Sequence, residues 1–282
     1  MQGRMVLGEL ATAFITGAAS GIGKALALAL AREGAALYLT DIDAEGLAKT
    51  CAEVKAFQAN VHMRTLDVAD REAVEAAAAD AMLKLGPVDA VFNNAGVSLS
   101  DTVASMSYKD LDWLMGINFY GVVYGTKAFL PAMLERGAGH IVNVSSLFGL
   151  IGVGSQSAYC AAKHAVKGFN ESLFYELDGT GVQVHSVHPG GVDTNIVLNG
   201  KHVHNLDGDT SAEKAQEGFQ DMIQTSAEGA ARIILDGVKR GQYRILVGPD
   251  ARRIDRLQRW MPNRWRKMFL KAMAERRSKT PF

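Results

Sequence analysis

The sequence has few cysteines and no long apolar segment. Only two cysteines, Cys51 and Cys160, occur among 282 residues, and they do not form a Cys-x-x-Cys pair. This scarcity excludes a disulfide scaffold and a cysteine-based zinc site. No stretch approaches the roughly 18 consecutive apolar residues of a membrane span, and the N-terminal sequence lacks the apolar core and cleavage site of a signal peptide. We therefore expect a cytoplasmic protein.

An excess of charge of one sign is also lacking, because 30 Lys and Arg residues balance 30 Asp and Glu residues. This balance gives no indication of a nucleic-acid partner, and none is expected. The segment 252–279 is the exception, since it holds eleven Lys or Arg residues and two acidic residues. With 48% hydrophobic and 21% charged residues, the composition is typical of a globular protein with a sizeable core.

Short apolar runs alternate with longer runs rich in alanine and leucine. The apolar runs predict strands at 11–16, 36–41, 61–67, 88–94, 139–146, 182–190 and 243–248. The longer runs predict helices near 23–34, 43–57, 70–86, 107–135, 157–178 and 227–241. This alternation predicts an α/β fold, with a single doubly wound, Rossmann-like parallel sheet of about seven strands and helices on both faces.

No linker or repeat divides the chain, so we expect one catalytic domain over residues 1–250. Within it, residues 191–226 are polar and lie between a predicted strand and a helix, which is typical of a lid beside a ligand crevice. Residues 251–282 form a basic extension whose apolar residues have helical spacing on both sides of Pro262. Three roles remain open for this extension: packing on its own core or substrate cleft, contact with a second subunit, or contact with an anionic membrane.

A glycine-rich turn joins the first predicted strand to the first helix in "FITGAASGIGKALALAL" (14–30). Gly17, Gly21 and Gly23 allow the main chain to turn tightly and to approach a ligand closely. The helix that follows, with Ser20 and Ile22 at its start, offers free N–H groups and a positive dipole end to a pyrophosphate. This position in a βαβ unit predicts a dinucleotide site.

Acidic residues end the next two predicted strands. Asp41 lies 18 residues after Gly23, where a carboxylate can accept hydrogen bonds from both adenosine ribose hydroxyls and repels a 2′-phosphate. Ile42 follows it instead of an arginine, and this favours NAD over NADP. Asp67, with Val68 beside it, is expected to reach the adenine. The alternative for Asp67 is an aspartate in the turn before a helix.

A tyrosine precedes a lysine by four residues in "SAYCAAKHAV" (157–166). Residues at this spacing share one face of a helix, so Tyr159 and Lys163 are expected side by side. A phenol ordinarily ionises near pH ~10, and a neighbouring positive charge lowers that pKa. Such a pair can move a proton near neutral pH, although most Tyr/Lys pairs at this spacing are ordinary surface pairs, so the spacing alone does not decide.

Six motifs, in order and in register, resemble those of the short-chain dehydrogenase/reductase family, in its single-domain NAD-dependent branch. They are "TGAASGIG" (16–23), "NNAG" (93–96), Asn118 in "GINFYG", "IVNVSS" (141–146), "YCAAK" (159–163) and "HPGGVDT" (188–194). The matching pieces extend from about residue 12 to 248. Ser146 precedes Tyr159 by 13 residues, which is the family's interval and distinguishes it from Ser145.

The resemblance implies a catalytic set of Asn118, Ser146, Tyr159 and Lys163. Tyr159 would be the general acid/base on the substrate oxygen, which Ser146 would orient. Lys163 would lower the pKa of Tyr159 and bind the nicotinamide ribose. Asn118 would hold a water that links Lys163 to solvent, and the alternative is an asparagine that is paired locally inside a helix.

The resemblance also implies further residues that line the cofactor. Besides the glycine turn, Asp41, Asp67, Val68, Tyr159 and Lys163, they are Asn93, Ala95, Gly96, Pro189, Gly190, Val192 and Thr194. The last four would wall the nicotinamide, with Thr194 touching its carboxamide or a phosphate. For Asn93, a structural bridge between strands is the alternative.

The expected activity is hydride transfer between NAD and a secondary alcohol or ketone that is hydrophobic: steroid-like, aromatic or long-chain. Two alternatives remain, an NADPH-linked carbonyl or 3-oxoacyl reductase and a non-catalytic NAD-binding protein. No metal is expected, because His185 and His188 have no third ligand in view. By the same resemblance, the helices near 107–135 and 157–178 are expected to pair subunits into a homodimer or homotetramer.

Overall fold

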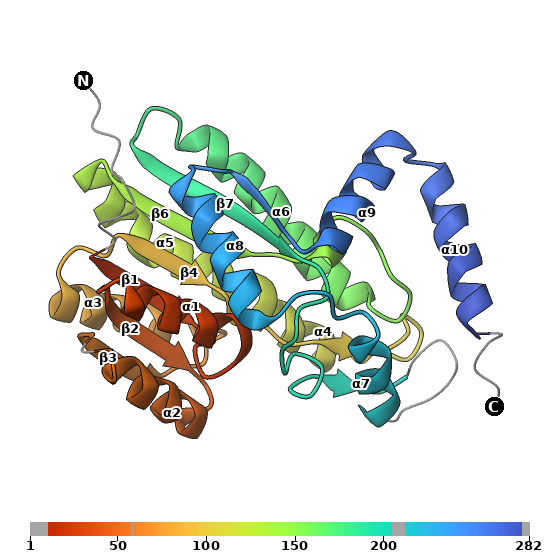
Figure 1. Cartoon of the computed structure of the whole chain (residues 1–282), viewed down its shortest axis with the longest axis horizontal. Helices are drawn as coiled ribbons and strands as arrows, with labels where there is room; N and C mark the ends of the chain where they lie inside the picture. Colours follow the sequence, from red (N-terminus) through yellow and green to blue (C-terminus); the bar gives the residue numbers. More distant parts are fainter. Residues whose placement is uncertain (1–10, 58, 205–211, 278–282) are drawn as a thin grey trace.

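The computed structural model describes residues 11–57, 59–204 and 212–277. At its centre, seven parallel strands lie in the order β3-β2-β1-β4-β6-β7-β9 (Figure 1). The strands are β1 (Thr12–Thr16), β2 (Ala36–Asp41), β3 (Val61–Thr65), β4 (Ala90–Asn93), β6 (Gly139–Val144), β7 (Val182–Pro189) and β9 (Arg244–Val247). The central strands β1, β4 and β6 are buried throughout, as expected for a sheet covered on both faces.

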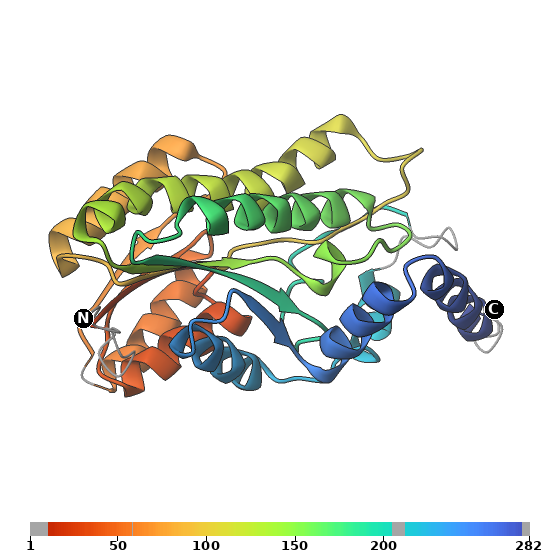
Figure 2. The same cartoon turned by 90° about the horizontal axis from the view of Figure 1, so that it is seen from above.

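Helices cover the two faces of this sheet (Figure 2). One layer contains α1 (Gly21–Arg32), α2 (Ala44–Lys55) and α8 (Ala227–Lys239). The other contains α3 (Arg71–Leu85), α4 (Tyr108–Met115), α5 (Gly121–Arg136) and α6 (Ser157–Glu176). The predicted fold class, a doubly wound Rossmann-like sheet of about seven strands, is therefore confirmed.

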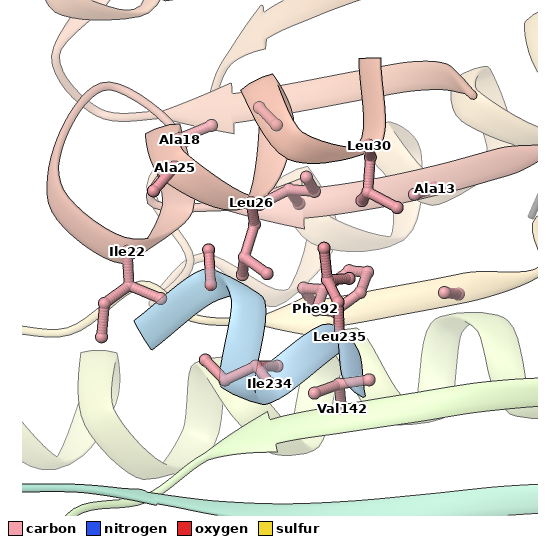
Figure 3. Close-up of a cluster of buried hydrophobic side chains, with 14 of the residues drawn as sticks. Ala13, Ala18, Ile22, Ala25, Leu26, Leu30, Phe92, Val142, Ile234 and Leu235 are labelled. Carbon is pink, nitrogen blue, oxygen red and sulfur yellow. The ribbon is translucent and has the colours of Figure 1, made fainter. Parts of the chain in front are cut away.

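The core beneath α1 holds the glycine turn in place. Leu26 and Leu30 of α1 point toward Leu235 of α8 and Phe92 of β4 (Figure 3), and all four are buried. Burying a side chain of this size contributes about 1.5–3 kcal/mol. The alternating Ala and Leu residues of α1 thus fix the N-terminus of this helix against the sheet.

Two local features were not predicted. The expected helix at 107–135 is interrupted by the π-helical turn η2 (Gly116–Tyr120) between α4 and α5. A two-stranded parallel ribbon joins β5 (Leu99–Ser100) to β8 (Lys201–His202). Strands of two residues carry no readable alternation, so sequence patterns do not reveal them.

The C-terminal extension consists of α9 (Pro249–Trp260) and α10 (Arg264–Arg277). The predicted basic helical tail, broken at Pro262, is confirmed by these helices. Figure 1 shows that α10 stands away from the sheet beyond α9. Among the described residues, no helix combines the length and the apolar character needed to cross a membrane.

Candidate active site

The predicted site residues follow the carboxyl ends of the parallel strands. Gly17 follows β1, Asp41 ends β2, Ala95 follows β4, Ser146 follows β6 and Gly190 follows β7. Because parallel strands end at the same edge of a sheet, segments far apart in the sequence meet along one crevice.

The glycine turn has the backbone that the sequence predicts. Gly17 has a φ of 67° and Gly21 a φ of 52°, values that residues with a Cβ rarely adopt. A Cβ on Gly23 would overlap the carbonyl oxygen of Gly17. The side chain of Ser20 makes no capping hydrogen bond at the start of α1. It therefore leaves the first N–H groups of this helix available to a ligand.

Ile22, the remaining predicted residue of the turn, points into the core (Figure 3) and is 9% exposed. Its side chain anchors the turn, and only its main chain is available to a cofactor. A hydrogen-bonding side chain on the other side of the turn, that of Asn94, was not predicted. The Asn94 amide donates to the carbonyls of Thr16 at 3.0 Å and Gly17 at 3.2 Å.

The Asp41 carboxylate lies beside the glycine turn and is fixed by two main-chain donors. Its Oδ2 accepts from Ala19 N at 2.9 Å, and its Oδ1 accepts from Asp43 N at 3.0 Å. The side chain remains partly exposed, and Ile42 beside it is 68% exposed. A negative charge is therefore held where an adenosine ribose would lie in a dinucleotide fold.

The next acidic position is arranged differently. Asp67 is exposed, and its Oδ1 accepts from Ala69 N at 2.9 Å in a local turn. The N-cap of α3 is Asp70, which accepts from Ala73 N. Val68 is 7% exposed and packs where a Cβ on Gly121 would meet it. Asp67 can face a ligand, whereas the Val68 side chain is part of the core.

Asn93 takes the structural alternative that the sequence left open. It is 2% exposed, and its amide donates to Asn143 Oδ1 of β6 at 2.8 Å and to Thr126 Oγ1 of α5 at 3.2 Å. The side chain bridges the sheet to α5, so only its main chain can face the crevice. Ala95 and Gly96, which follow it, are partly exposed and remain available to a cofactor.

The segment that follows β7 packs against the glycine turn. A Cβ on Gly21 would lie 2.9 Å from Thr194 Cγ2, which places Thr194 directly against the turn. Pro189 and Val192 are buried. Gly190 is packed against Asp250 of α9, whose Oδ2 accepts from the N–H of the next residue at 2.7 Å. The first turn of α9 therefore fixes the turn that the resemblance assigns to the nicotinamide.

Ser146, Tyr159 and Lys163 are brought together at 9%, 8% and 2% exposure. The Lys163 Nζ donates to Val144 O at 3.0 Å and lies 5.8 Å from the centroid of the Tyr159 ring. The Ser146 hydroxyl accepts from Phe148 N at 3.0 Å. The expected neighbourhood of Tyr159 and Lys163 on α6 is thus present, and it is buried rather than at the surface.

Burial shifts the pKa values of both groups away from their ordinary ranges. Desolvation raises the pKa of Tyr159 to about 12, and a hydrogen bond with Ser146 offsets part of this rise. Desolvation lowers the pKa of Lys163 to about 8. The expected lowering of the Tyr159 pKa by Lys163 is not found in the protein alone, where removal from water disfavours the charged forms of both groups.

Asn118 lies in the π-helical turn η2, a type of irregularity that occurs often at functional sites. It is fully buried, and its amide pairs at both ends with Val97, accepting from the N–H at 2.9 Å and donating to the carbonyl at 2.8 Å. A Cβ on Gly96 would lie 3.3 Å from Asn118 Oδ1 and 3.4 Å from Lys163 Nζ. Asn118 is therefore paired with the segment after β4 and not within its own helix, and Lys163 Nζ reaches the same segment.

The surroundings of Tyr159 are apolar and include the predicted lid. Tyr159 packs in a cluster that includes Ile196 and Val203 of the 191–226 segment. The Phe148 ring meets the Tyr159 ring edge-on at 6.1 Å. The ends of the segment are joined by the Val192–Thr225 bridge. Residues 205–211 of the lid are outside the described residues.

The tail contacts the same region from the other side. Trp265 of α10 is 7% exposed and packs with Leu150 and Ile151 after the short helix η3 (Leu147–Gly149). Phe148 belongs both to this cluster and to the cluster around Tyr159. Of the three roles predicted for the tail, packing on its own core is the one that these contacts support.

Within the described part of the chain, no group of three or more His, Cys, Asp or Glu residues could hold a metal ion. A pocket of about 350 Å³ lies outside the predicted site. It is lined by Gly149, Leu150, His164, Lys167, Arg244, Gln258 and Arg259. None of the predicted site residues lines this pocket.

Comparisons with known proteins agree with this geometry. The family model described as "short chain dehydrogenase" matches residues 11–202. A relative named "Putative oxidoreductase SadH", from Mycobacterium tuberculosis, is 45% identical over 267 residues, which cover 93% of this chain and 95% of that protein. Because this alignment omits fewer residues than the tail contains, part of the tail is shared with that relative.

Two further similarities concern a cofactor and a substrate. Levodione reductase from Leifsonia aquatica is 36% identical over 209 residues, covering 73% of this chain and 78% of that protein. Among solved structures, a short chain dehydrogenase/reductase from Burkholderia phymatum in complex with NAD has a TM-score of 0.80 at 32% identity. That similarity covers 88% of this chain and 92% of the other.

Proposed function

The chain belongs to the short-chain dehydrogenase/reductase family, and from this premise we propose that it transfers a hydride between NAD and a secondary alcohol or ketone. The observation that carries the proposal is the buried meeting of Ser146, Tyr159 and Lys163 at the same edge of the sheet as the glycine turn. A protein that only bound the cofactor would have no need of these three groups together.

The residues have distinct tasks in this reaction. Tyr159 takes the hydroxyl proton of an alcohol, or gives a proton to a ketone oxygen, while the Ser146 hydroxyl holds that oxygen. Below its pKa of about 8, Lys163 carries a positive charge beside the phenol. This charge favours the phenolate, which burial alone disfavours. When bound, the nicotinamide supplies the acceptor or donor of the hydride.

Asn118 has a positioning task in this proposal. Its amide holds the main chain of Val97 at both the N–H and the carbonyl. That pairing keeps the adjacent Gly96 against Lys163 Nζ. The π-helical turn that presents Asn118 therefore contributes to the site by fixing the wall that Lys163 faces.

We propose NAD rather than NADP as the cofactor because of Asp41. The two main-chain donors that fix its carboxylate leave it partly exposed beside the glycine turn. A negative charge at this position pairs with ribose hydroxyls and repels a 2′-phosphate.

The apolar cluster around Tyr159 supports a hydrophobic substrate. Phe148, Ile196 and Val203 lie in that cluster, so a substrate that reaches the phenol displaces water from apolar side chains. Trp265, packed behind Phe148, is the tail's contribution to the wall.

For the organisation of the chain, we propose a catalytic domain over residues 1–250, a substrate lid at about 191–226 and an extension over 251–282. Subunits are proposed to pair through α5 and α6 into a homodimer or homotetramer. On α6, Phe174 is 46% and Tyr175 78% exposed, so this helix offers two adjacent aromatic side chains to a second subunit. Light scattering after size exclusion tests this point, and a monomer would contradict it.

The proposed reaction is tested by NADH formation from NAD over a panel of secondary alcohols, from small to steroid-sized, with NADP in parallel. Turnover with NAD that increases with the apolar size of the alcohol is expected. Preference for NADP would favour a carbonyl reductase. Tight NADH binding without turnover of any alcohol or ketone would favour a binding protein. Co-sedimentation with anionic vesicles tests the membrane role of the tail, and no binding is expected.

A further inference from the structure

A continuous chain of hydrogen bonds crosses the protein interior behind Ser146. Its members come from β4, β6, α6 and β7, and each is at most 2% exposed: Asn93, Asn143, Asn170, Ser186 and His188. The successive distances between donors and acceptors are 2.8, 2.7, 3.0 and 3.0 Å. The chain ends at the Ser146 carbonyl oxygen, 3.1 Å from His188 Nδ1.

The bonds in this chain all point the same way. A carbonyl oxygen only accepts, so His188 Nδ1 carries the hydrogen. Burial lowers the pKa of His188 to about 4, so the ring is neutral and its Nε2 accepts from the Ser186 hydroxyl. The Ser186 oxygen in turn accepts from Asn170. Hydrogen bonds aligned in this way strengthen one another in a low-dielectric interior.

The bond from the His188 side chain to the Ser146 carbonyl continues the contact between β6 and β7 by one residue. The main-chain ladder between β6 and β7 ends where Ser145 N donates to Val187 O at 2.8 Å. Beyond that point, the His188 side chain holds the Ser146 carbonyl in place of a further main-chain bond. The Ser146 hydroxyl, which accepts from Phe148 N, therefore takes its position from a main chain that His188 fixes.

We propose that His188 is a positioning residue for the reaction, and this inference rests on the proposed function. Through the Ser146 carbonyl, it sets the place of the Ser146 hydroxyl relative to Tyr159. Because Pro189 and Gly190 follow His188 directly, the same bond ties Ser146 to the turn that is expected to wall the nicotinamide. His188 touches neither substrate nor cofactor and acts through Ser146.

The same strand provides a matched control. His185 is fully buried, three residues before His188, and burial lowers its pKa to about 4 as well. Its Nδ1 donates to Gln242 O at 2.7 Å, and its Nε2 accepts from His140 at 3.0 Å. The two histidines thus share a strand, a tautomer and a degree of burial, but only His188 reaches Ser146.

The test measures kcat, KM and NADH affinity for His188→Leu, His188→Asn and the same two substitutions at His185, in the full-length protein. Loss of a buried hydrogen bond in His188→Leu is expected to lower kcat about tenfold, with NADH affinity unchanged. Asparagine offers an N–H near the position of Nδ1, so His188→Asn should recover most of kcat. His185→Leu should lower the melting temperature and leave kcat unchanged.

Three results would overturn the proposal: an unchanged kcat in His188→Leu, an equal fall in His185→Leu, or no recovery in His188→Asn. If His188→Leu does not fold, Ser186→Ala takes its place, because it removes the donor to Nε2 with little change of volume. It should lower kcat about threefold, and an unchanged kcat would count against the proposal.

A readout without turnover separates this inference from the proposed reaction. Labelling with ¹³C-carbonyl serine and ¹⁵N-leucine reports the three Ser–Leu peptides of the chain by NMR, at 98–99, 146–147 and 172–173. The Ser146–Leu147 signal is assigned by its loss in Ser146→Ala. Its carbonyl resonance should move in His188→Asn or Ser186→Ala and stay in place in His185→Asn. If the wild type turns over no substrate but the resonance moves, the reaction is wrong and the contact stands. No movement would refute the contact itself.

Discussion

The two ends of the proposed active site are built in different ways. The cofactor end, with the glycine turn and Asp41, is partly exposed and is held by main-chain donors in the turns after β1 and β2 and by the Asn94 amide. The catalytic end, with Ser146, Tyr159 and Lys163, is buried and is fixed by contacts with other strands. Affinity for a cofactor can therefore be altered locally, whereas proton transfer depends on how the interior is packed.

The largest expected effect comes from breaking the catalytic end alone. Lys163→Met removes the positive charge beside Tyr159 while keeping a similar volume, so kcat should fall about a thousandfold. The melting temperature should stay equal or rise, because a buried charge is replaced by an apolar group. Lys167→Met, one turn further along α6, is the control, and its kcat should match the wild type.

The same variant tests the pKa of Lys163. Burial lowers that pKa from 10.5 to about 8, so between these values the unfolded chain binds more protons than the folded one. Stability contributed by this group therefore rises with pH from about 8. Above pH 10, the raised pKa of Tyr159 has the opposite effect. Urea unfolding should give a higher free energy of unfolding at pH 10 than at pH 8 in the wild type, and no such rise in Lys163→Met. An equal rise in both proteins would contradict the assignment.

A smaller effect is expected from altering the cofactor end alone. Asp41→Ala combined with Ile42→Arg replaces the charge that repels a 2′-phosphate with one that attracts it. The ratio of kcat/KM for NAD to that for NADP should fall about a hundredfold. The kcat at saturating cofactor should not change, since the catalytic end is untouched. A variant that keeps the wild-type preference would refute the role of Asp41.

The glycine turn allows a sharper test of close approach. A Cβ on Gly23 would overlap the Gly17 carbonyl, so Gly23→Ala should destabilise the fold by about 1–3 kcal/mol and weaken NADH binding. Gly34 has a φ of 87° and no atom within 4 Å of an added Cβ. Gly34→Ala should therefore cost stability, about 1 kcal/mol, without changing NADH affinity. Equal losses of affinity in both variants would show that overall strain, not the turn, is responsible.

The smallest effect is expected where the tail supports the substrate wall. Trp265 packs behind Phe148, whereas Trp260 is 86% exposed. Trp265→Ala should lower kcat/KM for large apolar alcohols roughly threefold relative to small ones, less than loss of a direct pocket contact. Trp260→Ala should leave this ratio unchanged. An equal change of this ratio in both variants would show that the packing of Trp265 behind Phe148 does not influence substrate selection.

The sequence predicted the parts of the molecule that depend on local pattern. The alternation of strands and helices predicted the sheet. The glycine turn and the position of Asp41 were predicted because each is marked by residues that lie close together in the sequence. The burial of Tyr159 and Lys163, and the pKa shifts that follow, depend on packing between distant segments. No residue pattern reports how much water remains around a side chain.

The orientation of individual side chains was also beyond the sequence. Asn93 occurs in a cofactor motif, yet its amide turns inward to Asn143, and Ile22 turns into the core. His188 was dismissed as a metal ligand, and its bond to Ser146 is visible only when β6 and β7 are side by side. The π-helical turn at Asn118 has no signature in hydrophobic periodicity.

Proton transfer by Tyr159 is the central claim, and one measurement tests it most directly. NADH formation in the first turnover is followed by rapid mixing of NAD and the best secondary alcohol with the wild type and with Tyr159→Phe. The wild-type rate should rise between pH 6 and 8, while Tyr159→Phe should be about a thousandfold slower at each pH with unchanged NADH affinity. Equal rates in the two proteins would contradict the account.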